Sequence, residues 1–152
     1  MTEPTAVYGS FTVERRFPAT QARVFAAFAD PALKARWFVG PEGWTEVERS
    51  CDFREGGRER TMGRFASGFV TDFLATYHDI VPDRRIVYSY AMHLDGRRIS
   101  VSLATVEILP DGAGTRLLVT EQGSFFDGYE DKGAREHGTG LLMDRLGATL
   151  AD

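Results

Sequence analysis

The chain has 152 residues, the length of one domain, and a domain of this size buries about two-thirds of its unfolded surface. Its content of 43% hydrophobic and 26% charged residues is ordinary for a soluble globular protein. The net charge of −4 argues against a nucleic acid or an anionic membrane surface as the main partner.

The chain carries one cysteine, Cys51, so no internal disulfide is possible and a reducing compartment is expected. Neither a basic start followed by an apolar run nor a stretch of about eighteen apolar residues occurs. We therefore expect no secretion signal and no membrane span, and the expected location is the cytoplasm.

The first third of the chain predicts one strand and two short helices. Residues 1–8 form a polar lead-in that is expected to be loose, and the alternation from Ser10 to Phe17 predicts the first strand. Thr20 can cap a helix, and Asp30-Pro31 is a start signal for a second, shorter one. The apolar residues of the first helix share one face: Val24, Phe25 and Phe28.

From Trp44 the apolar pattern changes to a period of two, which predicts strands. Six strands are expected, and they cover residues 44–53, 58–65, 69–81, 86–92, 99–109 and 115–122. Turn signals of hairpin length separate them, among them Asp95-Gly96 and Asp111-Gly112. Hairpin connections join antiparallel neighbours, so the sheet is predicted to be antiparallel.

The end of the chain predicts one long helix, from about residue 131 to 150. Leu142, Leu146 and Leu150 recur once per turn, and Met143 lies beside them. This apolar stripe must be buried, and the concave face of the sheet is the large apolar surface available for it. We expect residues 1–152 to form a single α+β domain, a seven-stranded antiparallel sheet wrapped around this helix.

A sheet wrapped around one helix often leaves a hollow, and aromatic residues are frequent throughout this chain. An aromatic-lined hollow is suited to an apolar ligand, with tyrosine phenols as polar handles and an arginine for an acidic group. The alternatives are core packing for the aromatic residues and a solvated face for the arginines of residues 58–64. The candidate ligand-binding residues are Trp37, Phe38, Trp44, Arg60, Met62, Tyr88, Tyr90 and Leu142.

Glu121 and His137 are the candidate catalytic pair. If Leu117 and Val119 face the core, alternation brings Glu121 to the same face, and His137 lies in the first turns of the last helix. A carboxylate near an imidazole in a partly apolar hollow can act as general acid and base, whereas the alternative is a structural anchor. The three histidines and Cys51 lack zinc-ligand spacing, so neither a metal nor a cofactor is expected.

Motifs spread over residues 10–150 resemble a known family. They are Phe17-Pro18-Ala19, Asp30-Pro31, Trp37-Phe38, Phe53-Arg54-Glu55-Gly56-Gly57, Arg85-Ile86-Val87-Tyr88-Ser89-Tyr90, Gly114-Thr115-Arg116-Leu117 and Glu121-Gln122-Gly123. In this order they are similar to the START-like (SRPBCC) helix-grip superfamily, and within it to bacterial relatives of the activator of the 90-kDa heat-shock protein's ATPase. The resemblance implies a helix-grip fold and a cavity that in relatives holds lipids, polyketides or other hydrophobic molecules.

The resemblance also implies that a chaperone is a candidate partner. The eukaryotic activators carry a separate N-terminal domain with its own chaperone-contacting motif, and this chain has no room for such a domain. It also has no nucleotide-binding glycine loop, so no ATPase chemistry of its own is expected.

Three functions therefore remain open. The first is a binding domain that holds a hydrophobic or aromatic small molecule under the last helix. The second is a cyclase- or hydrolase-type enzyme that acts on such a ligand through Glu121 and His137. The third is an interaction module or homodimer, with Val101 and Leu103 on the outer sheet face while the alternate residues Ser100, Ser102 and Ala104 point inward.

Overall fold

The structure, a computed structural model, describes residues 3–151, and its helices and strands follow in the order that the sequence predicts. The elements are β1 (Ala6–Phe17), α1 (Gln21–Ala29), α2 (Pro31–Lys34), β2 (Trp44–Cys51), β3 (Arg58–Phe65), β4 (Val70–Val81), β5 (Arg85–Leu94), β6 (Arg97–Asp111), β7 (Gly114–Phe126) and α3 (Ala134–Leu150).

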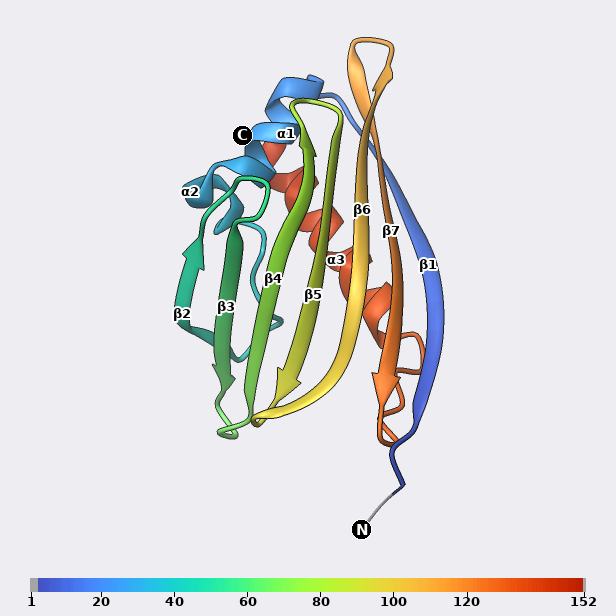
Figure 1. The fold of residues 1–152 in the computed structure, drawn as a ribbon. Coiled ribbons are helices and arrows are strands. Elements are labelled where there is room, and N and C mark those ends of the chain that lie inside the picture. Colours follow the sequence, from blue (N-terminus) through green and yellow to red (C-terminus); the bar gives the residue numbers. More distant parts are fainter. Residues whose placement is uncertain (1–2, 152) are drawn as a thin grey trace.

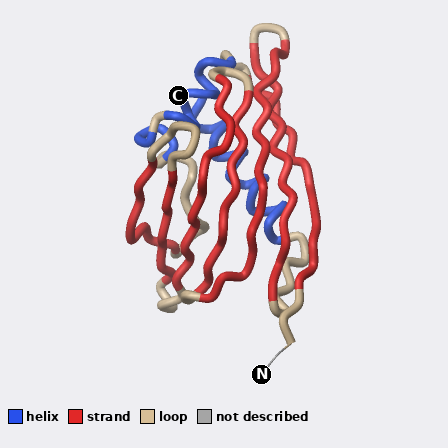
Figure 2. Tube along the Cα trace, viewed as in Figure 1, coloured by secondary structure: helices blue, strands red, loops and turns tan. Residues whose placement is uncertain are grey.

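The seven strands form one antiparallel sheet in the order β1-β7-β6-β5-β4-β3-β2. Each of the strands from β2 to β6 is joined to the next one by a hairpin, and β1 pairs with the free edge of β7. The long helix α3 lies obliquely across one face of this sheet, and α1 and α2 lie at one end of it (Figure 1). Figure 2 shows the same two layers, with the helices on one side of the strands. The predicted helix-grip fold is therefore confirmed.

Local capping explains where the helices begin. The Thr20 side chain accepts a hydrogen bond from the backbone N–H of Arg23 at 3.2 Å and caps α1. The Asp30 carboxylate accepts a hydrogen bond from the backbone N–H of Ala32 at 2.9 Å and caps α2, and Pro31 occupies the first position of that helix. The last helix begins three residues after its predicted start, because Gly133 adopts a left-handed conformation with φ 80°.

The predicted loose lead-in of residues 1–8 is wrong for residues 6–8. These residues belong to β1, which begins at Ala6 and pairs there with Phe126 of β7. The last strand likewise continues past its predicted end at Gln122. Each extension supplies the hydrogen-bonding partner of the other. Residues 1–2 of the lead-in lie outside the described residues.

The apolar core lies between the sheet and α3 and is closed at one end by α1. Gly147 lets the helix approach the sheet, because a Cβ at this position would lie 2.8 Å from a ring carbon of Phe17. Of the predicted stripe, Leu146 is fully buried, whereas Leu142 is half-buried. The expected near-complete burial of Leu142 is wrong, because its side chain lines a hollow between helix and sheet.

No helix within residues 3–151 is long and apolar enough to cross a membrane.

Candidate ligand-binding cavity

A cavity of about 580 Å³ lies between the sheet, α3 and the segment after α2. This volume is within the range that small-molecule sites use. Its walls are mainly apolar and aromatic, and they include Phe28, Trp37, Phe38, Trp44, Phe65, Phe69, Phe73, Tyr88, Tyr90, Met92, Leu142 and Met143. Six of the eight predicted ligand-binding residues are among these: Trp37, Phe38, Trp44, Tyr88, Tyr90 and Leu142.

The two tryptophans have different positions in the wall. Trp37 belongs to the core, with 2% of its surface exposed, and its indole N–H donates to the carbonyl of Ala27 at 3.0 Å. Trp44 is half-buried, and its N–H donates to the Thr71 hydroxyl at 2.9 Å. Its indole packs directly over Gly63, where a Cβ would lie 1.8 Å from the ring. A side chain at Gly63 would therefore displace Trp44 from the cavity wall.

The prediction that Arg60 and Met62 face the cavity is wrong. The inward residues of β3 are Glu59 and Thr61, so alternation places Arg60 and Met62 on the outer face. There the Arg60 guanidinium binds the Asp72 carboxylate through two hydrogen bonds, of 3.1 and 2.9 Å. The alternative for this row, a solvated face, describes Arg60 correctly, because Arg60 lies on the outer side of the sheet.

A polar cluster lies in the cavity beside the first turn of α3; we call it the Arg135 cluster, and it consists of Tyr90, Ser100, Ser102, Glu121 and Arg135. The Tyr90 hydroxyl donates to Glu121 Oε1 at 2.5 Å. Arg135 Nη1 donates to the Tyr90 oxygen at 3.0 Å and to Ser102 Oγ at 3.3 Å, and Nη2 donates to Ser100 Oγ at 3.0 Å. The guanidinium also lies 5.1 Å from the ring centroid of Phe125. No sequence signal marked Arg135 as a cavity residue, since a charged residue at a helix start is ordinarily solvated.

Glu121 and His137 both line the cavity, but the structure gives Glu121 a different partner from the predicted one. Leu117, Val119 and Glu121 are buried on one face, as alternation predicts. Within residues 3–151 no hydrogen bond joins His137 to Glu121, whose carboxylate binds Tyr90 instead. His137 is exposed, at the edge of the cavity.

Burial raises the pKa of Glu121 above its ordinary value, and nearby Asp131 adds to the rise, while Tyr90 and Arg135 partly oppose it. Burial and the neighbouring Glu121 also raise the pKa of Tyr90, which keeps its phenol protonated. The cluster therefore holds a hydroxyl donor, a guanidinium and a carboxylate that takes up a proton more readily than usual.

We expect the stability of the protein to report this shift. A carboxyl group with a raised pKa in the folded state stabilises the fold at acidic pH, and this contribution is lost as the pH rises through the folded-state pKa. The unfolding free energy of Glu121→Gln, relative to that of wild type, should therefore shift in favour of the variant as the pH rises above the ordinary glutamate pKa of about 4.3. Urea denaturation at several pH values measures this difference, and a difference that does not change with pH would contradict it.

A second buried cluster lies at the other end of the cavity, where α2 meets β3 and β4. Lys34 Nζ donates to Glu59 Oε1 at 2.7 Å, and the Tyr77 hydroxyl donates to the same oxygen. All three side chains are almost fully buried. The Lys34 ammonium also lies 4.6 Å from the ring centroid of Phe38. These groups satisfy one another, which indicates a structural role.

Cys51 lies beside this second cluster and is half-buried. Its Sγ is 3.8 Å from Glu59 Oε1. Burial, with a further contribution from the Glu59 charge, raises the pKa of the thiol. A raised pKa disfavours the reactive thiolate, which is consistent with Cys51 acting as a small hydrophobic residue.

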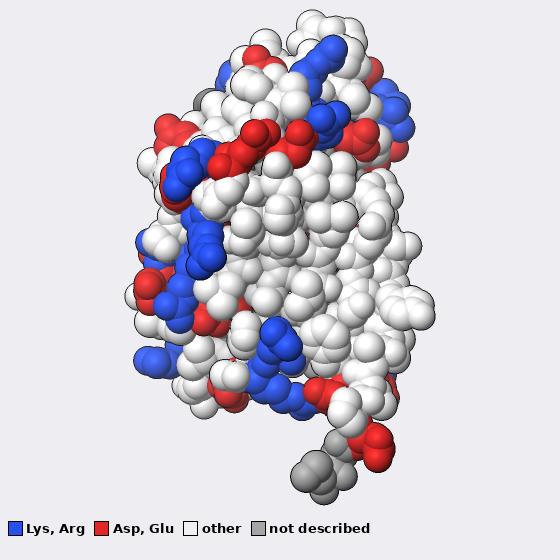
Figure 3. Space-filling model, in the orientation of Figure 1, with Lys and Arg blue, Asp and Glu red and all other residues white. Residues whose placement is uncertain are grey.

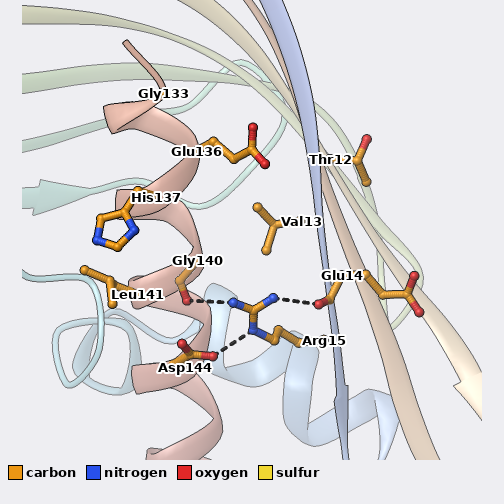
Figure 4. A pocket seen from close by; sticks show the side chains of 10 residues that line it. All are labelled: Thr12, Val13, Glu14, Arg15, Gly133, Glu136, His137, Gly140, Leu141 and Asp144. Atoms are coloured by element: carbon orange, nitrogen blue, oxygen red, sulfur yellow. Dashed lines mark hydrogen bonds and ion pairs between the residues drawn. The ribbon is translucent and has the colours of Figure 1, made fainter. Parts of the chain in front are cut away.

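A second hollow, of about 460 Å³, lies on the surface between β1 and α3. Arg15 crosses it from β1, and its guanidinium binds the Asp144 carboxylate at 2.7 Å and the Gly140 carbonyl at 3.4 Å. Figure 4 shows that His137 and Leu141 lie on the opposite side of the helix from Arg15. These contacts fasten β1 to α3.

Two hydroxyl groups in the cavity wall lack a protein partner among the described residues. Thr61 Oγ1 is buried and has no hydrogen bond. The Tyr88 hydroxyl also has none within residues 3–151, and burial is the main cause that raises its pKa well above the ordinary value. The Tyr88 hydroxyl is available to a bound molecule, whereas Thr61 Oγ1 has almost no accessible surface. Across the same residues, no group of three or more histidine, cysteine or acidic side chains is arranged to hold a metal ion.

Comparison with known proteins finds similarity over almost the whole chain. The family model described as activator of Hsp90 ATPase homolog 1-like protein matches residues 18–151. No curated protein matches the chain.

Several solved structures are similar to this one. An uncharacterized protein from Rhizobium leguminosarum is 40% identical, with a TM-score of 0.94 and 99% of each chain covered. A protein from Rhizobium loti is 45% identical, with a TM-score of 0.89, and the match covers 95% of this chain and 99% of that one. A protein from Chromobacterium violaceum is 26% identical, with a TM-score of 0.76 and coverage of 94% and 97%.

Proposed function

Because the chain belongs to the activator of Hsp90 ATPase homolog 1-like protein family, we propose that it is a binding domain for a hydrophobic or aromatic small molecule. The observation that carries the proposal is the aromatic-lined cavity under α3. An apolar pocket with a small number of polar groups is the usual form of a small-molecule site. The Arg135 cluster and the Tyr88 hydroxyl are such groups.

Filling the cavity should weaken ligand binding. Leu142 is half-buried in the cavity wall, so Leu142→Trp would place an indole in the space that a ligand needs. We expect this variant to bind the neutral dye Nile red at least about tenfold more weakly than wild type. The measurement is a fluorescence titration of each purified protein.

Ala148→Trp is the matched control, because it adds the same side chain at an exposed position of the same helix. It should bind the dye as wild type does. Equal binding by all three proteins would place the dye outside the cavity, and absence of binding by wild type would contradict the proposal itself.

An enzyme of the cyclase or hydrolase type is the second candidate. It is supported by Glu121, whose raised pKa suits a general acid or base and whose Oε2 has no hydrogen-bond partner within residues 3–151. Tyr90 and Arg135 would then stabilise the charge that develops on the ligand. His137 would act through a ligand rather than through a direct bond to Glu121.

The outer face of the sheet is the observation that supports an interaction module or a homodimer. Val101 and Leu103 are 40% and 38% exposed, and Ser100, Ser102 and Ala104 point inward as this hypothesis requires. Figure 3 shows a broad area of this face without lysine, arginine or acidic residues. The hypothesis also requires a filled core, however, and the cavity favours the binding domain instead.

A further inference from the structure

We propose that the cavity selects an uncharged aromatic ligand with a hydroxyl group, which donates a hydrogen bond to Glu121 and accepts one from Arg135. This inference rests on the proposed binding function and specifies the chemical class of the ligand. It follows from the charges around the Arg135 cluster and from the hydrogen-bonding capacity that the cluster leaves unused.

Glu121 has hydrogen-bonding capacity that the cluster leaves unused. Its Oε1 accepts from the Tyr90 hydroxyl at 2.5 Å. Arg135 donates to the Tyr90 oxygen at 3.0 Å and so strengthens the donor that faces Glu121. The second oxygen, Oε2, lacks a partner among the described residues and can accept from a ligand.

Arg135 retains the capacity to donate to a ligand. Its three hydrogen bonds within the cluster all end on neutral hydroxyl groups, those of Tyr90, Ser100 and Ser102. A guanidinium has five N–H groups, so donors remain for a further acceptor. A ligand hydroxyl placed between the two residues would donate a hydrogen bond to Glu121 and accept one from Arg135.

The local charges disfavour an anionic ligand at this end of the cavity. Glu121 and Asp131 both line the cavity together with Arg135, and both Asp131 and Arg135 shift the pKa of Glu121, so the three charges lie close enough to influence one another. Asp131 is fixed there because it accepts from the backbone N–H of Arg135 at 3.1 Å. An anionic ligand would bring a third negative charge against the single positive charge of Arg135 in a partly buried site.

Two other cations line the cavity, and neither provides an equivalent site for an acid. Lys34 is paired with Glu59 at 2.7 Å. Arg145 lies about 15 Å from Arg135 along the helix axis, and its Nη1 donates to the carbonyls of Trp37 and Val39 at 3.4 and 2.9 Å. An acid bound at Arg145 would leave the Arg135 cluster unused, and the test below detects that case.

The test compares four pyrene ligands by fluorescence titration of the wild-type protein at neutral pH: pyrene, pyrenemethanol, its methyl ether and pyrenecarboxylate. The alcohol can donate and accept, the ether can only accept, and the carboxylate carries the negative charge. A hydrogen bond to a charged group corresponds to about 10- to 100-fold in affinity, so the alcohol should bind more tightly than the other three by about that factor.

Glu121→Gln tests the residue that the proposal names. In this variant the advantage of the alcohol over the ether should fall several-fold, and the carboxylate should bind more tightly than it does to wild type, because the negative charge is removed. Glu136→Gln is the matched control, since Glu136 is exposed and lines the surface hollow on the side of α3 that Arg15 crosses. It should keep the wild-type order of the four ligands.

The outcomes separate this inference from the proposed function. If none of the four ligands binds, both fail. If pyrene binds but the carboxylate is the tightest ligand, or the alcohol gains nothing over the ether, the binding function stands and the hydroxyl inference is overturned. An unchanged ligand order in Glu121→Gln overturns the role of Glu121. The wild-type titrations decide the ligand class even if that variant does not fold.

Discussion

Replacing Leu146 with alanine is expected to lower the unfolding free energy by about 2–5 kcal/mol. Leu146 has no exposed surface and lies in the main core, where α3 packs against the sheet. The truncation removes apolar contacts and leaves a void that close-packed neighbours fill only in part. Because the core includes both the sheet and α1, the loss should affect the whole fold.

Urea denaturation of the purified variants measures this loss. Leu141→Ala is the matched control, since Leu141 is 49% exposed on the same helix, and its effect should be small. Leu142→Ala should lie between the two, because Leu142 is half-buried and already borders empty space. A loss below about 1 kcal/mol for Leu146→Ala would show that α3 is not packed on the sheet as the structure describes.

Replacing Lys34 with methionine is expected to cost about 3–5 kcal/mol at neutral pH. The reason is the charge that the substitution leaves behind, because Glu59 is 3% exposed and Lys34 is its cationic partner. Tyr77 still donates to Glu59, but one neutral hydroxyl does not replace the ammonium group. The aliphatic stem of methionine fills much of the space that lysine occupied, so the electrostatic loss dominates.

A double-variant cycle separates the lost charge from lost packing. Lys34→Met combined with Glu59→Gln removes both charges, so the double variant should be more stable than the sum of the two single losses predicts. Lys132→Met is the control for the substitution itself, because the Lys132–Glu130 pair is exposed, and its effect should be close to zero. Additive losses in the cycle would mean that Lys34 and Glu59 are not coupled.

Local sequence signals were sufficient for the order of the elements. Thr20 and Asp30 cap the two short helices as predicted, and the Asp95-Gly96 turn adopts positive φ angles of 50° and 79°. Each of these signals acts between residues that are close in the chain, so the surrounding fold is not needed to interpret it. The ends of β1 and β7 were predicted less well, because Ala6 and Phe126 support each other across the whole length of the chain.

The faces of the strands were predictable only where the apolar pattern was clear. In β7, Leu117 and Val119 identified the inward face, and Glu121 followed from them by alternation. In β3 both faces carry charged residues, so the pattern did not distinguish Arg60 from Glu59.

The sequence by itself determined the fold class and the aromatic lining, because both follow from local periodicity and from turn and cap signals. Only the tertiary structure decided the polar end of the cavity. Tyr90, Glu121 and Arg135 come from β5, β7 and α3, and they meet because the sheet pairs β5 to β7 through β6 and α3 crosses its face. The inward position of Glu59 on β3 likewise depends on packing between elements, because its partner Lys34 lies on α2, 25 positions away in the sequence. Contacts of this kind depend on where whole elements pack, and no residue pattern within one element encodes them.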